Sequence, residues 1–116
     1  MVCCRPDLAY AMSVLSKYLD KPTYEHLRAA KYVLRYLRGT TDLTLVYKRG
    51  NTEIIGYSDA DWAGDLDERR STSGYLFTLN GTAISWRSKL QDTIALSIVK
   101  AEYIAMSEAI KESIWL

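Results

Sequence analysis

The chain has 116 residues, of which 48% are apolar and 25% charged, and its formal net charge is +1. This length allows one modest domain, and the composition is that of a globular protein rather than a disordered one. The charge is unevenly distributed. Residues 1–52 carry nine Lys and Arg against four Asp and Glu, whereas residues 53–116 carry six against ten. The first half is therefore basic and the second half acidic.

The cysteine pattern and the lengths of the apolar segments indicate the cellular compartment of the chain. Cys3 and Cys4 are adjacent and lack Cys-x-x-Cys spacing, which predicts reduced thiols rather than a disulfide framework or a metal site. No apolar run reaches the roughly 18 residues of a membrane span, and the first ten residues lack a signal-peptide pattern. We expect a cytoplasmic or nuclear location, no membrane partner and no secretion.

The basic half is predicted to contain two helices. Apolar residues at helical spacing predict the first helix over residues 6–19, with Pro6 in its first turn and Pro22 beyond its end. The second helix is expected to begin after Thr23 as N-cap and to end at Arg38, with Gly39 as its stop. One side of it carries four cations, which suit either a solvated face or a phosphate-binding surface. These are Arg28, Lys31, Arg35 and Arg38.

The acidic half is predicted to contain an antiparallel sheet and a long helix. Alternation predicts a strand over residues 43–48, and a turn-rich link over residues 48–52 then separates the two halves. Strands are expected over residues 53–59, 73–79 and 83–86, with a tight hairpin at Asn80-Gly81. A helix capped by Ser97 should run to the last residue. We therefore predict an α/β fold with two N-terminal helices, a three-strand antiparallel meander and one long helix.

Three carboxylates in this half are candidates for a metal site. Asp59 and Asp61 share one side of the strand that ends in Ser58-Asp59-Ala60-Asp61, and carboxylates at such a position readily bind hard cations. Winding the last helix at about 100° per residue places Glu102 in the middle of a wide apolar arc. A carboxylate there must pair, protonate or hold a metal. The alternative is a solvated loop acid and a helix acid paired with a lysine.

Several segments resemble a known family in the family's own order. They are Arg5-Pro6-Asp7-Leu8-Ala9-Tyr10, Leu34-Arg35-Tyr36-Leu37-Arg38-Gly39-Thr40, Tyr57-Ser58-Asp59-Ala60-Asp61-Trp62-Ala63-Gly64-Asp65, Arg69-Arg70-Ser71-Thr72-Ser73-Gly74-Tyr75, Ile84-Ser85-Trp86 and Ala101-Glu102-Tyr103. With these segments the chain resembles the C-terminal part of copia-type LTR retrotransposon Pol polyproteins, at the join between reverse transcriptase and ribonuclease H.

The resemblance implies a division of the chain and a chemistry. Residues 1–52 look like the end of reverse transcriptase with its connection, and residues 53–116 like the N-terminal half of a ribonuclease H domain. Such enzymes cut the RNA strand of RNA–DNA hybrids with Mg²⁺ held by several acids. Asp59 matches the first-strand aspartate and Glu102 the first-helix glutamate, with Asp61 as a neighbouring ligand. Nucleic acid and the remainder of the Pol polyprotein are the implied partners.

The chain also departs from the family pattern. Similar polyproteins supply further acids in segments that follow Ile114-Trp115-Leu116, so we expect the truncated unit to be inactive alone. Lys100 replaces a family glutamate that would complete a capping box with Ser97, which costs about 0.5–1 kcal/mol of helix stability. One alternative is a host-retained nucleic-acid-binding or protein-interaction module that uses the basic helix and the open sheet edge. Another is a reading frame without function.

Overall fold

The computed structural model describes residues 4–50 and 52–116, so Cys3 and Asn51 lie outside the described residues. The chain divides into two compact units, Met1–Leu45 and Val46–Leu116, which we call the N-terminal and C-terminal units. This division comes earlier than the predicted boundary after residue 52. The assignment of the halves to reverse transcriptase and ribonuclease H stays a prediction. Within the described residues, no helix is long and apolar enough to span a membrane.

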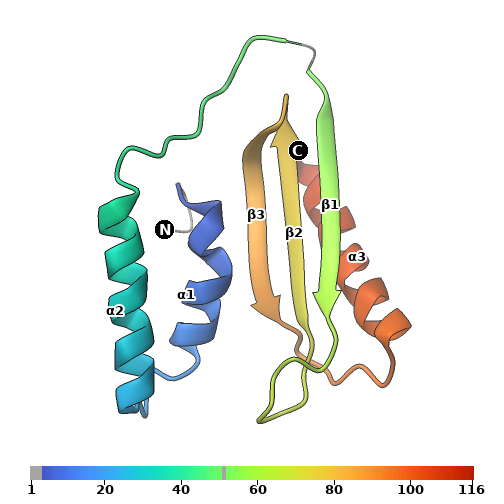
Figure 1. The fold of residues 1–116 in the computed structure, drawn as a ribbon. Helices are drawn as coiled ribbons and strands as arrows, with labels where there is room; N and C mark the ends of the chain where they lie inside the picture. Colours follow the sequence, from blue (N-terminus) through green and yellow to red (C-terminus); the bar gives the residue numbers. More distant parts are fainter. Residues whose placement is uncertain (1–3, 51) are drawn as a thin grey trace. The chain divides into compact units, whose positions relative to one another are not determined.

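The N-terminal unit contains the two predicted helices. A 3₁₀ turn over Pro6–Leu8 leads into α1 (Ala9–Ser16), and α2 covers Tyr24–Gly39 (Figure 1). The expected extension of the first helix to residue 19 is wrong. The backbone N–H groups of Lys17 and Tyr18 donate to carbonyls only three residues back, which tightens and ends the helix.

The start of α2 confirms Thr23 as its N-cap and adds a partner that the sequence analysis missed. The Thr23 backbone N–H donates to Nδ1 of His26 over 3.0 Å, so His26 completes a capping box. The His26 ring also stacks on Tyr18, with ring centroids 4.0 Å apart. Gly39 is the last helical residue, and the stop is at Thr40, whose N–H donates to the Leu37 carbonyl.

A polar clasp joins the start of the N-terminal unit to the end of α2. Arg5 forms a 2.8 Å ion pair with Asp7 and donates to the carbonyl and hydroxyl oxygens of Thr40. The Tyr36 hydroxyl donates to Asp7 over 2.9 Å. The hydrogen bond from Arg5, followed by that from Tyr36, lowers the pKa of Asp7 to about 2. Two of the family-like segments, which lie about 30 residues apart, thus meet in space.

The C-terminal unit contains the predicted meander. The strands β1 (Ile54–Asp61), β2 (Thr72–Leu79) and β3 (Thr82–Leu90) pair antiparallel in the order β1-β2-β3 (Figure 1). Asn80 and Gly81 both have positive φ, as the tight hairpin requires. β3 is five residues longer than predicted, one at its start and four at its end, because the residues from Arg87 to Leu90 continue to pair with β2.

The predicted strand over residues 43–48 is wrong, because these residues form no backbone ladder. Side chains of the C-terminal unit hold part of this segment instead. Thr82 and Asn80 donate to the carbonyls of Val46 and Lys48. The Tyr47 hydroxyl donates to the Ala83 carbonyl. The segment is therefore attached by single side-chain hydrogen bonds.

The long helix α3 covers Ile98–Trp115 and packs on β1 and β2. Its predicted cap is confirmed, since Ser97 accepts the Lys100 N–H over 3.2 Å. Of the predicted wide apolar arc, the alanines are buried as expected, but the burial of the larger residues is wrong. Only three alanines of α3 are buried, and the larger apolar residues of the arc are exposed. The three are Ala101, Ala105 and Ala109. Alanines allow a close approach of helix and sheet, which excludes the bulkier side chains from the contact.

The predicted fold class is confirmed. The chain is α/β, with two helices, a three-stranded antiparallel meander and one long helix in that order.

Candidate functional site

The strand that carries the predicted acids is held at its end by two side-chain hydrogen bonds. The Trp62 indole N–H donates to the Ala95 carbonyl over 3.1 Å, and the Ala63 N–H donates to the Ser71 hydroxyl. Ser71 is fully buried. The end of β1 is therefore attached to the start of β2 and to the loop that precedes α3.

A buried glutamine fixes the first turns of α3 to the sheet. The Gln91 side chain, 1% exposed, donates through Nε2 to the Ser73 hydroxyl (2.9 Å) and to the Ala101 carbonyl (3.0 Å). Its backbone N–H donates to the Ser71 carbonyl over 2.8 Å. Gln91 thereby positions the helical turn that carries Glu102. Sequence reasoning missed this residue, since a single glutamine in a polar loop carries no periodic signal.

The structure places the predicted acids on neighbouring elements. Asp59 and Asp61 are exposed near the end of β1, and Glu102 is half-buried on α3, beside the buried alanines rather than at the centre of the packed face. On β2, Ser73 and Phe77 face α3, whereas Asp59 lies opposite Gly74. Strand alternation therefore assigns Asp59 to the sheet face that α3 does not cover. The register therefore separates Asp59 from the sheet face that α3 covers with Glu102, and it does not support a cation pocket shared by these two acids; metal binding by either acid stays a prediction.

The described residues do not fit a complete magnesium site. Among residues 4–50 and 52–116, no three His, Cys, Asp or Glu side chains group as a metal site would require. Asp59 Oδ1 accepts the Ala60 N–H over 2.9 Å, and the Asp61 carboxylate occupies the space where a side chain on Gly64 would lie. Magnesium favours six oxygen ligands in octahedral geometry, so we derive no chemical step through this ion.

A second polar cluster lies between β3 and α3. The Ser85 hydroxyl donates to Glu112 over 2.5 Å. Burial, followed by the negative charge of Glu112, raises the pKa of Tyr75 in the same cluster. The helical winding placed Glu112 only at the boundary of the apolar arc. Its contact with Ser85 could not be anticipated without the sheet register.

The basic stripe of α2 is exposed along its whole length. Arg28 and Arg35 lie over the ring of Tyr32, with 5.8 and 5.4 Å between each guanidinium carbon and the ring centroid. Lys31 and Arg38 are exposed on the same helix. Guanidinium groups held over an aromatic ring keep N–H donors available to anions. The stripe is thus a cationic surface in which stacking on Tyr32 restricts the positions of two guanidinium groups.

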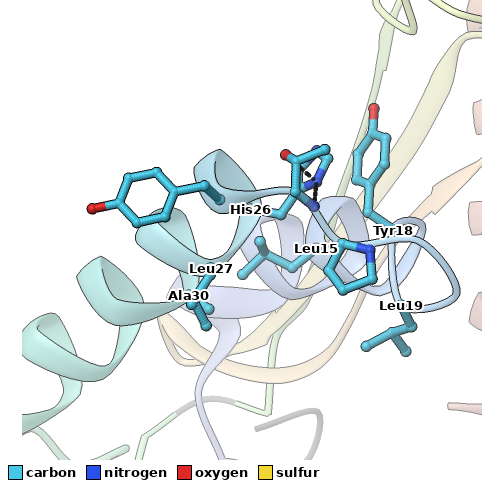
Figure 2. Close-up of a pocket in the computed structure, with 9 residues that line it drawn as sticks. Leu15, Tyr18, Leu19, His26, Leu27 and Ala30 are labelled. Carbon is cyan, nitrogen blue, oxygen red and sulfur yellow. Dashed lines mark hydrogen bonds between the residues drawn. The ribbon is translucent and has the colours of Figure 1, made fainter.

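The N-terminal unit also contains an apolar groove of about 350 Å³ between α1 and α2 (Figure 2). Leu15, Leu19, Leu27 and Ala30 supply most of its apolar wall. Two of its polar members, Thr23 and His26, already bond to each other at the helix cap. The groove therefore has a mostly apolar wall that suits an apolar group.

Comparison with known proteins places this chain among transposon sequences. No family model and no solved structure matches it. The chain is 55% identical over its full length to the Retrovirus-related Pol polyprotein from transposon TNT 1-94 of Nicotiana tabacum, and 47% identical over 97% of its length to that from transposon RE2 of Arabidopsis thaliana. It spans 9% and 8% of these proteins.

A relative of similar length carries a different name. The chain is 56% identical to Secreted RxLR effector protein 161 of Plasmopara viticola, over its full length and 82% of that protein. The identities to the Pol polyproteins extend across the whole chain, which includes the N-terminal clasp, the acidic strand end and α3. Over nearly its whole length the chain is thus similar to a segment of the Pol polyproteins of copia-type retrotransposons.

Proposed function

We propose that residues 53–116 are the N-terminal half of a ribonuclease H-like unit of a Pol polyprotein and that the isolated chain does not cleave RNA. Asp59 and Glu102 would correspond to metal-ligand positions of that unit, with Asp61 beside them and Mg²⁺ as the implied cofactor. Residues 1–52 would be the end of reverse transcriptase with its connection, and the remainder of Pol the natural partner.

One observation carries this proposal. The full-length similarity to Pol polyproteins includes both elements with matched acids, β1 and α3. The lack of a three-residue metal group among the described residues supports the absence of cleavage. With only two matched acids, an ion would keep too few protein ligands to activate water on a scissile phosphate.

The test is cleavage of an RNA–DNA hybrid by the purified full chain in magnesium. We expect no release of labelled RNA above that of the Asp59→Asn and Glu102→Gln variants, whose folding is checked by circular dichroism. Release by the natural chain that both substitutions abolish would overturn the proposal of inactivity. A magnesium titration followed at the Asp59 and Glu102 amides then measures metal binding, and shifts confined to other residues would contradict the assigned ligand positions.

A second candidate function is nucleic-acid binding without catalysis, through the basic stripe. The paired stacking of Arg28 and Arg35 on Tyr32 favours it, because it holds two cations on one helix face. Phosphate contacts of this kind depend strongly on salt, with a slope of roughly −0.7 to −0.9 in log K against log salt for each contact.

This candidate is tested by fluorescence anisotropy with a labelled RNA–DNA hybrid at several salt concentrations. Arg28→Gln with Arg35→Gln should reduce both affinity and the salt slope. Lys100→Gln, which removes an exposed cation from α3, serves as the matched control and should change neither. Binding that does not depend on salt would exclude the stripe.

A further inference from the structure

The connection between the two units contains a segment that the C-terminal unit holds by side chains alone. Residues 41–52 join Thr40, the C-cap of α2, to Glu53, whose carbonyl accepts the Asn80 N–H over 3.3 Å. Where the structure describes this connection, it forms no helix and no strand (Figure 1). The contacts of the connection with the C-terminal unit therefore decide how much of it is free.

The β2–β3 hairpin donates two hydrogen bonds to residues 46–50, which we call the strap. The Thr82 hydroxyl donates to the Val46 carbonyl over 2.6 Å, and the Asn80 side-chain amide donates to the Lys48 carbonyl over 3.3 Å. Asn80 also has the positive φ that the tight hairpin requires. One residue thus forms the turn and holds the strap.

The strap donates a third hydrogen bond to the hairpin. The Tyr47 hydroxyl donates to the Ala83 carbonyl over 2.9 Å. Val46 and Tyr47 nevertheless remain 58% and 56% exposed, so little apolar surface is buried. Hydrogen bonds between exposed groups contribute little net stability, and ordering a segment of this length costs conformational entropy of comparable size. We therefore expect the attached and released states of the strap to lie close in free energy.

Release of the strap would lengthen the free part of the connection. While the strap is attached, residues 41–45 are free, and an extended segment of this length spans at most about 17 Å. After release, residues 41–52 are free and span at most about 40 Å. The range of distances that the N-terminal and C-terminal units can reach thus depends on the strap.

We propose that the strap is a releasable device that sets the length of the connection between the two units. Attached to the hairpin, it limits their separation, and its release lengthens the free connection roughly twofold. The attached state requires the side chains of Tyr47, Asn80 and Thr82, and release leaves both units folded. This device is independent of the cleavage proposal and of the basic stripe on α2.

The first experiment measures backbone amide relaxation of the full chain by NMR. We expect order parameters above about 0.6 at Tyr47 and Lys48, with relaxation dispersion from a minor released state. In a triple variant with Tyr47→Phe, Asn80→Gly and Thr82→Val, the order parameters should fall below about 0.6. Glycine permits the positive φ of the turn, and valine suits a strand, so the hairpin should persist. Unchanged amide shifts in β1 and β2 check this.

Matched controls remove the same chemical groups away from the strap. Tyr103→Phe removes a hydroxyl from an exposed tyrosine of α3, and Thr93→Val removes one from an exposed threonine of the loop before it. Neither substitution should change the order parameters of the strap. An equal loss of order in these controls would contradict a specific role for the three bonded side chains.

The second experiment measures the distance distribution between spin labels on α2 and α3 by pulsed electron paramagnetic resonance. The labels are attached at Ala29→Cys and Lys111→Cys, both exposed positions, after the natural cysteines are replaced by serine. We expect the triple variant to broaden the distribution and to extend its upper limit by about 20 Å. An unchanged distribution would contradict control of the connection by the strap.

The remaining outcomes also decide the proposal. A strap in the natural chain that is as mobile as in the triple variant would show that no attached state exists. A strap without relaxation dispersion, as rigid as β2, would show that it is not released. If a substitution in the hairpin disturbs the sheet, Tyr47→Phe alone keeps the test decisive, because Tyr47 lies outside the ladder. This variant should raise the mobility of the strap by itself, and unchanged order would overturn the proposal.

Discussion

The two units of this chain are stabilised in different ways. In the described part of the N-terminal unit, Leu8 is the one buried apolar side chain, and the ends of the unit are joined by the clasp of Arg5, Asp7, Tyr36 and Thr40. The C-terminal unit buries apolar side chains together with hydrogen-bonded polar ones. These are Phe77, Ala95, Ala101, Ala105 and Ala109 with Ser71, Ser73, Thr78 and Gln91.

This difference shows what the family-like segments do in the fold. In the N-terminal unit two of them meet through Arg5 and Tyr36, and in the C-terminal unit Gln91 joins Ser73 to the carbonyl of Ala101. Residues that belong to recognisable motifs thus make structural contacts as well as supplying candidate ligands. The surface clasp should contribute less to stability than the buried contacts, because water competes for exposed polar groups.

The largest effect is expected from Gln91→Ala. The substitution leaves the Ser73 hydroxyl and the Ala101 carbonyl without their buried donor, which should lower the free energy of unfolding of the C-terminal unit by about 2–3 kcal/mol. Amide hydrogen exchange measures the loss separately in each unit. Asp92→Ala, at the exposed neighbouring residue, is the control. Faster exchange in α1 and α2 as well would contradict the division into two units.

A smaller loss is expected from Ala105→Leu, because Ala105 is 1% exposed at the contact of α3 with the sheet. Overpacking at such a position costs about 1–3 kcal/mol and should push α3 away from β1 and β2. Met106→Leu adds a similar apolar residue at the exposed neighbouring position and should be nearly neutral. Urea denaturation compares the two variants. Equal stability would mean that the alanine face does not set the distance between helix and sheet.

Much of the fold could be predicted from local signals. The caps at Thr23 and Ser97 and the Asn80-Gly81 hairpin depend on neighbouring residues, and the structure has all three. The strand predicted over residues 43–48 failed because alternation alone does not supply a pairing partner. Its carbonyls instead accept side-chain hydrogen bonds from residues more than 30 positions away.

The candidate site was harder to predict than the fold. The helical periodicity distinguishes residues of α3 only by polarity. The close approach of α3 to the sheet, however, leaves room only for small side chains. Ala101 is therefore buried, whereas Val99 is 78% exposed. Gln91 and Glu112 gain their roles through contacts 10 to 27 residues away. Such contacts depend on how α3 packs against the sheet, which the local pattern of each element does not specify.

The clasp of the N-terminal unit is expected to contribute about 1 kcal/mol, so Asp7→Asn should cost that amount near neutral pH. The folded pKa of Asp7, about 2, lies below its ordinary value of 3.8. Its contribution is therefore complete above pH 3.8 and is lost as the pH falls through 2. Exchange of the α2 amides should follow this dependence in the natural chain and not in the variant. Tyr36→Phe, which removes one donor to Asp7, should give a partial loss.

The smallest effect is expected from His26, whose ring has two roles at the start of α2. His26→Ala removes the acceptor for the Thr23 N–H and the stack on Tyr18, and should cost about 0.5–1 kcal/mol in the N-terminal unit. His26→Gln separates the roles, since glutamine can accept the Thr23 N–H but cannot stack as an aromatic ring. If the cap dominates, the glutamine variant retains protection of the Thr23 amide against exchange. If both variants lose this protection equally, the stacking of His26 on Tyr18 stabilises the start of α2. The N-terminal unit then depends on apolar contacts more than the exposure of its side chains indicates.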